Sequence, residues 1–273
     1  MKLRINFDNQ IYPCDSLKKY AERRQQNIII SGNEGCGKTH LARQYSVYLG
    51  IRDFIIVKPT VDELTSTMEA LIGSQNDVCL CIENLDTAVI GASYSILKFL
   101  EEPPKNVFIV ITCRNINRIP YTILSRCPLI DVHNPTKDDI MRYCSRTDID
   151  AYNRIKNHLI YNCIKTFSDA NIVLGMDADK LQYFEKLPEI MKCNDTVSNI
   201  SYKLSHYPDK SKSDICIVLR YIMWTSDDKT IWKYVIGCTD DIRLGRVADW
   251  CAVAVFAMRV KNYVCRESLC STC

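Results

Sequence analysis

Short apolar runs alternate with amphipathic stretches along the first half of the chain. The runs read NIIISG, DFIIVK, VCLCIE, NVFIVIT and PLIDV, and most are rich in Ile and Val. Strands that are buried on both faces of a parallel sheet have this continuous apolar character, and the stretches between them have helical periodicity. We therefore predict an α/β fold with a parallel sheet over residues 1–135.

Strand patterns fade after this region, and the chain becomes helical. Thr136 precedes Asp139 by three residues, which is a capping pattern at the start of a helix. We predict a small helical unit over residues 136–195. Apolar stripes in SDICIVLRYIMW and TIWKYVIGC predict a third, all-helical unit over residues 196–273.

The most apolar segment, VADWCAVAVFAMRV at 247–260, is shorter than the roughly 20 residues that a membrane crossing needs. It also contains Asp249 and Arg259, so we predict a buried helix and no membrane partner. The first residues contain no apolar run of signal-peptide length, which predicts an intracellular, cytoplasmic protein.

The chain has 273 residues, a formal net charge of +3 and 15 cysteines. The charge is compatible with contact to a nucleic-acid backbone but does not by itself argue for it. Cysteines inside apolar runs act as small hydrophobic residues in a reducing compartment. The tail CRESLCSTC could supply three metal or cluster ligands, Cys265, Cys270 and Cys273; the alternative, which we favour, is a reduced tail.

A glycine-rich turn follows the first apolar run and precedes an amphipathic helix. Its sequence fits G-x-x-x-x-G-K-[ST], in which backbone N–H groups surround phosphate oxygens, the lysine reaches the terminal phosphates and the hydroxyl holds Mg²⁺. Cys36 inside the turn is either an oxidisable thiol or a small filler. The predicted ATP-binding set is Gly32, Asn33, Glu34, Gly35, Cys36, Gly37, Lys38, Thr39 and His40.

The run NDVCLCIENLD is a predicted strand that ends in acidic residues. In a phosphate-loop fold, carboxylates at this place emerge beside the magnesium ion. We therefore predict that Glu83 holds Mg²⁺ together with Thr39, directly or through a water.

Two further segments carry a specific resemblance. ILKFLEEPP at 96–104 and TILSRC at 122–127 resemble the AAA+ clamp-loader ATPases, in particular the delta-prime and gamma-type subunits of the DNA polymerase III loader. The resemblance implies a RecA-like core, a helical lid and a C-terminal collar. It also implies a clamp-loader subunit that works with other clamp-loader subunits, a sliding clamp and primer-template DNA, with ATP and Mg²⁺ as cofactors.

The same resemblance assigns individual residues. It places Asn84 at the position of the catalytic glutamate, and an amide cannot accept a proton from water. The sensor residue falls near Cys113 or Arg114, and no family-like sensor arginine stands out in 160–195. In contrast, Arg126 matches the arginine that reaches the nucleotide of a neighbouring subunit, which predicts hydrolysis in trans and an impaired cis site.

Weaker features of the same region concern nucleotide and DNA contacts. Tyr12 is a candidate for the adenine pocket, and Lys98 lies on a helix that faces DNA in such loaders; a packed tyrosine and a solvated lysine are the alternatives. The region between Thr39 and Glu83 lacks the cysteine cluster of many bacterial relatives, so no zinc is expected. Two other functions stay open, an independently active AAA+ ATPase such as a helicase loader and a nucleotide-free scaffold.

Overall fold

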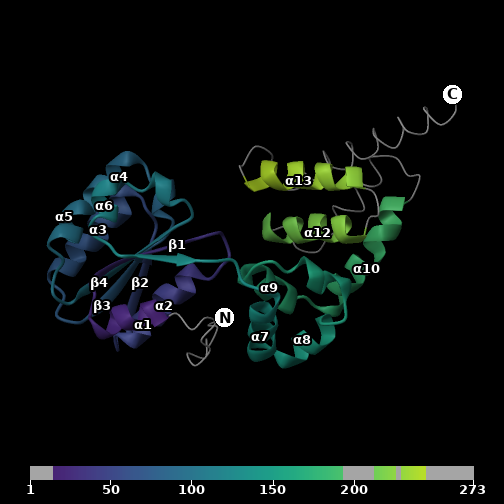
Figure 1. Ribbon diagram of the computed structural model, residues 1–273, viewed down its shortest axis with the longest axis horizontal. Coiled ribbons are helices and arrows are strands. Elements are labelled where there is room, and N and C mark those ends of the chain that lie inside the picture. The colour runs from purple at the N-terminus through teal and green to yellow at the C-terminus, as the bar shows by residue number, and fades with distance from the viewer. Residues whose placement is uncertain (1–14, 193–211, 226–228, 244–273) are drawn as a thin grey trace. The chain divides into compact units, whose positions relative to one another are not determined.

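The computed structural model describes residues 15–192, 212–225 and 229–243 (Figure 1). Contacts divide the chain into two compact units. The first unit runs to Tyr143 and also includes Thr166–Ser168; the second contains Cys144–Lys165 and the residues from Asp169 onward. Among the described helices, none combines the length and the apolar character that a membrane crossing requires.

The first unit is built on one parallel sheet, in the order β2-β3-β4-β1-β5. β1, β3 and β4 are inside the sheet and buried along their whole length, which explains their uninterrupted apolar sequences. The predicted α/β fold with a parallel sheet is therefore confirmed. The strands are β1 (Asn27–Gly32), β2 (Asp53–Val57), β3 (Val78–Ile82), β4 (Val107–Cys113) and β5 (Leu129–Val132).

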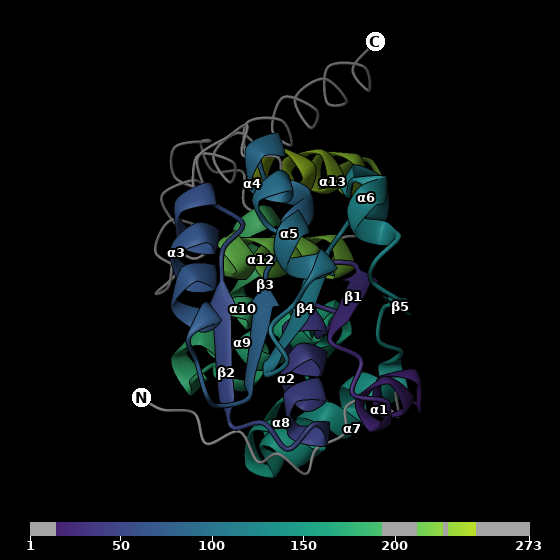
Figure 2. The same cartoon turned by 90° about the vertical axis from the view of Figure 1, so that its left-hand side faces the viewer.

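Helices cover both faces of this sheet (Figure 2). α1 (Asp15–Glu22) and α2 (Lys38–Tyr48) pack on one face, where Leu17, Leu41 and Tyr45 join the even-numbered positions of β1 in one apolar cluster. The opposite face is covered by α3 (Val61–Ile72), α4 (Ile90–Ser95), α5 (Leu97–Glu101) and α6 (Tyr121–Leu124). The short 3-10 turns η1 (Leu85–Thr87) and η2 (Ile116–Arg118) follow β3 and β4.

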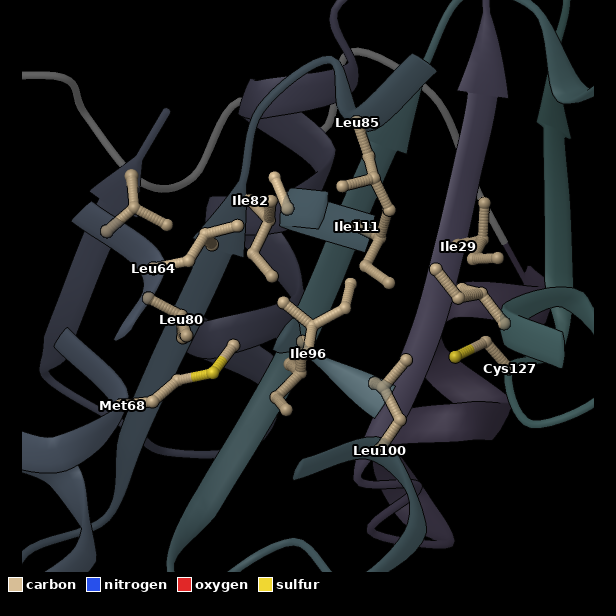
Figure 3. Close-up of a cluster of buried hydrophobic side chains, with 14 of the residues drawn as sticks. Ile29, Leu64, Met68, Leu80, Ile82, Leu85, Ile96, Leu100, Ile111 and Cys127 are labelled. Carbon is tan, nitrogen blue, oxygen red and sulfur yellow. The ribbon is translucent and has the colours of Figure 1, made fainter. Parts of the chain in front are cut away.

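Each face of the sheet has its own apolar cluster, and β3 contributes alternate side chains to both. The cluster beneath α3, α4, α5 and α6 shows this alternation. Leu80 and Ile82 of β3 point into it together with Met68 of α3, while Cys79 and Cys81 belong to the cluster on the other face (Figure 3). Both cysteines are fully buried. Burial raises the pKa of Cys79 to about 12, so this thiol is a protonated core residue at neutral pH.

The predicted helix start at residue 136 is confirmed. The backbone N–H of Thr136 donates to Oδ2 of Asp139 at 2.9 Å, and the N–H of Asp139 donates to Oγ1 of Thr136 at 3.2 Å. This reciprocal pair is a capping box, because each side chain satisfies a backbone N–H of the first helical turn. It begins α7 (Lys137–Thr147).

The described part of the second unit is helical. The two apolar stripes predicted as helices form α12 (Lys212–Thr225) and α13 (Lys229–Arg243), which confirms both predictions. Arg220 and Asp169 form a largely buried bidentate ion pair, with N–O distances of 2.6 and 2.8 Å. The other elements are α8 (Ile149–Ile155), η3 (Leu159–Cys163), α9 (Phe167–Leu174) and α10 (Ala178–Lys192).

Some predictions fall outside the described residues. They are the helix at 247–260, the C-terminal tail with Cys265, Cys270 and Cys273, and Tyr12.

Candidate functional site

The glycine-rich turn connects the end of β1 at Gly32 to the start of α2 at Lys38. Gly37 precedes the helix with φ +97, and Gly35 has φ +75, a backbone conformation that side chains with a Cβ rarely adopt. At Gly32 a Cβ would lie 2.6 Å from the carbonyl oxygen of Val132. The turn therefore has the strand, glycine conformations and helix start of a phosphate-binding loop.

A second segment of the first unit lies against this loop. The backbone N–H of Phe167 donates to the carbonyl oxygen of Gly35 at 3.1 Å. A Cβ on Gly35 would lie 2.7 Å from Oγ1 of Thr166 and 3.2 Å from Oγ of Ser168. Thr166, Phe167 and Ser168, the residues that approach Gly35 here, are uncharged.

Lys38 is buried, with 7% of its surface exposed, and its ammonium group bonds within the loop. Nζ donates to the carbonyl oxygens of Gly32 and Asn33, at 2.8 Å each. Burial lowers the pKa of Lys38, and repulsion from Arg114 adds to this effect. The ammonium group is thus held at the loop by two neutral acceptors, and an anionic ligand would be a stronger partner for it.

Thr39 and Glu83 lie together, as the sequence predicts for a magnesium pair. Oγ1 of Thr39 donates to Oε1 of Glu83 at 2.6 Å, which joins the first turn of α2 to the residue after β3. Hydroxyl and carboxylate oxygens are the donors that Mg²⁺ prefers. Together with the loop backbone and Lys38, these residues fit a magnesium-bound nucleotide, whose metal would supply charge neutralisation for the phosphates.

Asn84, at the position that the resemblance assigns to a catalytic glutamate, has a left-handed backbone with φ 51 and ψ 51. Its N–H donates to Oγ1 of Thr112 at 3.0 Å, and Oδ1 accepts from Nε of Arg114 at 3.4 Å. Asparagine adopts the left-handed conformation more readily than glutamate does. The local backbone therefore gives a structural reason for the amide.

Arg114 follows β4 and points toward the phosphate loop. Its guanidinium forms an ion pair with Glu34 at 2.9 Å. The backbone N–H groups of Arg114 and Asn115 donate to the two carboxylate oxygens of Asp86, at 3.0 and 3.3 Å. Of the two candidates for the sensor position, Cys113 is fully buried in the sheet, so Arg114 is the one whose side chain reaches the loop.

Arg126 lies two residues after the end of α6, and its side chain is 33% exposed. The guanidinium forms an ion pair with Glu101, the first glutamate of the LEEPP segment, at 2.6 Å and also donates to the carbonyl oxygen of Thr122. The two motifs that carry the resemblance, LEEPP and SRC, are therefore joined by a direct contact. The alternative interpretation of Arg126, a surface ion pair, describes its state in the isolated chain.

The remaining candidates have simpler environments. Cys36 is fully buried, and burial raises the pKa of its thiol, which favours the small filler over a reactive thiolate at the helix start. His40 is half-buried in the first turn of α2. The amide of Asn33 donates to Oδ1 of Asn134 at 3.1 Å on the surface. Lys98 is exposed on α5.

Sequence reasoning missed several contributors to the site. Asp86 is 9% exposed and fixes the backbone at Arg114, and its place in the acidic motif is a signal that could have identified it. Thr112 lies in an apolar strand and Thr166 follows a loop, and no sequence pattern marks either residue. Glu101 is recognisable as a partner of Arg126 only from the fold.

Comparisons with known proteins bear on the resemblance to a family and on the fold. Residues 6–136, just under half of the chain, match the family model described as DNA polymerase III, delta subunit. The resemblance to the clamp-loader ATPases is confirmed. The DNA polymerase III subunit delta′ of Buchnera aphidicola subsp. Baizongia pistaciae is 24% identical over 226 residues, which cover 80% of this chain. These residues span 63% of that relative, less than two thirds of its length.

A solved structure shows a likeness in fold that extends beyond the region matched by the family model. The DNA polymerase III gamma subunit-related protein of Thermotoga maritima superposes with a TM-score of 0.57 and 13% sequence identity. The match covers 93% of this chain and 99% of that one. At this identity the likeness supports the fold, a RecA-like parallel core followed by helices.

Proposed function

We propose that this chain is a delta-prime-like subunit of a sliding-clamp loader that binds ATP with Mg²⁺ and hydrolyses it weakly or not at all. The observation that carries the proposal is the contrast between neighbouring residues. Lys38, Thr39 and Glu83 form a complete binding arrangement, whereas Asn84 stands where water activation requires a carboxylate. Binding is thus separated from turnover.

Weak hydrolysis follows from the chemistry of Asn84. Its amide oxygen can hold a water through a hydrogen bond, but it cannot take the proton. Loss of a general base lowers a rate by roughly 10² to 10⁴. Binding does not depend on this group, because the contacts to phosphates come from the loop backbone, Lys38 and Thr39.

Arg126 is proposed to act on the nucleotide of a neighbouring subunit. In the isolated chain it pairs with Glu101 on the surface, and such an exposed ion pair contributes about 0–1 kcal/mol. An arginine that neutralises charge on a transferring phosphoryl group is worth on the order of 10³ to 10⁵ in rate. If Arg126 leaves Glu101 to contact a phosphate of the neighbouring subunit, the lost ion pair therefore costs little compared with the gain in hydrolysis rate.

The proposed partners are other clamp-loader subunits, a sliding clamp and primer-template DNA, in the cytoplasm. The domain assignment that goes with this role is a core at 1–135, a helical lid at 136–195 and a collar at 196–273. Exposed Lys98 is a candidate for a DNA backbone contact, which salt would weaken.

Calorimetric titration of the purified chain with ATP, with and without Mg²⁺, tests the binding part. Binding that is tightened by Mg²⁺ and lost in Lys38→Ala supports the proposal. Hydrolysis is measured on the same monomeric sample. Brisk turnover by the monomer would contradict the proposal and favour the independently active ATPase.

One observation favours a second candidate function, a scaffold subunit that works without nucleotide. The loop groups that would hold phosphates and Mg²⁺ already have partners within the chain: Lys38 bonds to two carbonyls, and Thr39 bonds to Glu83. The same titration separates the two functions. If the folded protein does not bind ATP at millimolar concentration, the scaffold is the function that remains.

A further inference from the structure

The phosphate loop contains an acidic residue, Glu34, between its first two glycines in sequence. A phosphate ligand at this loop would be attracted by Lys38 and the start of α2, and repelled by a carboxylate in the loop. Glu34 is the acidic member of the segment GNEGCGKT, and its side chain is 65% exposed. Its charge therefore opposes the ligand for which the rest of the loop is built.

The carboxylate of Glu34 is neutralised by Arg114, at an N–O distance of 2.9 Å. The two residues are 80 positions apart in the sequence, so the sheet brings them together. Asp86 accepts hydrogen bonds from the backbone N–H groups of Arg114 and the following residue, Asn115. The Arg114 side chain is 43% exposed, and besides the ion pair it makes a long hydrogen bond of 3.4 Å from Nε to Oδ1 of Asn84. The backbone of Arg114 is thus held in place, while its exposed guanidinium group can exchange Glu34 for another anion.

Lys38 and Arg114 both bond to this loop, Lys38 to the carbonyl oxygens of Gly32 and Asn33 and Arg114 to the carboxylate of Glu34. Two cations are therefore held at the loop that would bind a nucleotide, and Glu34 compensates one of them. An exposed ion pair of this kind is weak, and a charge-assisted bond to a phosphate is stronger.

We propose that the Glu34–Arg114 pair is an electrostatic latch: Glu34 holds Arg114 in the empty loop and lowers nucleotide affinity, and Arg114 transfers to the terminal phosphate of a nucleoside triphosphate. The inference rests on the proposed nucleotide binding and deepens it. Glu34 sets the affinity of the loop, and Arg114 sets its preference for triphosphate over diphosphate. Replacement of the Glu34 carboxylate by a neutral group therefore strengthens nucleotide binding, although the substitution alters the binding loop itself.

The test is a set of calorimetric titrations with ATP and with ADP, in excess Mg²⁺, on wild type, Glu34→Gln, Arg114→Met and the double variant. Glu34→Gln is expected to bind ATP about tenfold more tightly than wild type. Arg114→Met is expected to lose ATP affinity while ADP affinity is not reduced, and the double variant to bind ATP and ADP about equally.

Glu69→Gln is the matched control. Glu69 is an exposed glutamate near the end of α3. This end of α3 connects to the amino end of β3, whereas the phosphate loop follows the carboxyl end of β1. Glu69→Gln removes the same charge from the protein without altering the Glu34–Arg114 pair, so this variant is expected to bind ATP and ADP with wild-type affinities. Thermal unfolding of each variant confirms that it is folded.

The outcomes separate the latch from the proposed function. Unchanged or weaker ATP binding in folded Glu34→Gln, or an equal loss of ATP and ADP affinity in Arg114→Met, would overturn the latch while wild-type binding stands. Binding by Glu34→Gln but not by wild type would support the latch and contradict ATP binding by the native chain. Failure of all variants to bind would overturn both.

Discussion

Oγ1 of Thr39 and Oε1 of Glu83 are 2.6 Å apart, although 44 positions separate the residues in the sequence. The contact joins the phosphate-loop helix α2 to the carboxyl end of β3. Ligands of α/β folds bind at this end of a parallel sheet, where loops from several strands converge. The pair therefore lies at the end of the sheet where the proposed magnesium ion of a bound nucleotide would be held.

Glu83→Gln tests this pair. The substitution retains the size of the side chain and removes its charge, so Mg²⁺ loses an anionic partner. We expect the gain in ATP affinity on addition of Mg²⁺ to fall about tenfold, as for the loss of one charged contact. Titrations without Mg²⁺ are the control, and a variant that keeps the full magnesium effect would rule out this role for Glu83.

Gly35→Ala is expected to destabilise the first unit for two reasons, the positive φ of +75 and the approach of the new Cβ to Thr166 at 2.7 Å. Strain and overpacking each cost about 1–3 kcal/mol. Urea unfolding measures the loss. Gly50→Ala has the same φ with nothing within 4 Å, and Gly73→Ala has open space without the positive φ.

These two controls separate strain from overpacking. The expected order of destabilisation is Gly35→Ala, then Gly50→Ala, with Gly73→Ala near neutral. Equal effects at Gly35 and Gly50 would show that Thr166 does not press on the loop.

Asp86→Ala is expected to lower the free energy of unfolding by about 1–3 kcal/mol, because it leaves two backbone N–H groups without their acceptor. The same change releases the backbone at Arg114, so the preference for ATP over ADP should also decrease. Urea unfolding and nucleotide titration check the two effects. Glu69→Ala, on the exposed face of α3, is expected to change neither, and a stable Asp86→Ala protein would refute the anchoring role.

Stability is expected to fall at alkaline pH. Burial raises the pKa of Cys79 to about 12 from its ordinary value of 9.0, so above pH 9 the unfolded chain releases a proton that the folded chain retains. This contribution to stability is complete below pH 9 and is lost between pH 9 and 12, at about 1.4 kcal/mol per pH unit for one thiol.

Unfolding of wild type and Cys79→Ala at a series of pH values measures this effect. The slope of stability against pH should be shallower in the variant above pH 9 and the same in both proteins below pH 8. Parallel slopes over the whole range would contradict the assignment to Cys79.

Much of the fold could be predicted from local pattern. The five apolar runs became the five strands, and the capping pair Thr136 and Asp139 marked the start of α7, because burial on both faces and helix capping leave direct traces in the sequence. The phosphate loop was likewise readable, since glycine spacing, Lys38 and Thr39 are all local.

The charge arrangement around the loop could not be predicted in this way. Glu34 and Arg114 are paired only because β1 and β4 are neighbours in the sheet, and Glu101 reaches Arg126 only because α5 packs beside α6. Cys36 is open to two interpretations in the sequence, and its burial, a property of the packed unit, favours the small filler over the reactive thiol.

The central claim is that this chain binds ATP for assembly and lends Arg126 to a neighbour. The most direct test is the ATPase rate of the complex that this chain forms with its native partners. The complex is assembled with the wild-type chain, with Arg126→Ala or with Lys38→Ala. We predict that Arg126→Ala lowers the rate on the order of 10³-fold or more, whereas Lys38→Ala changes it little. A large loss with Lys38→Ala and a normal rate with Arg126→Ala would contradict the account.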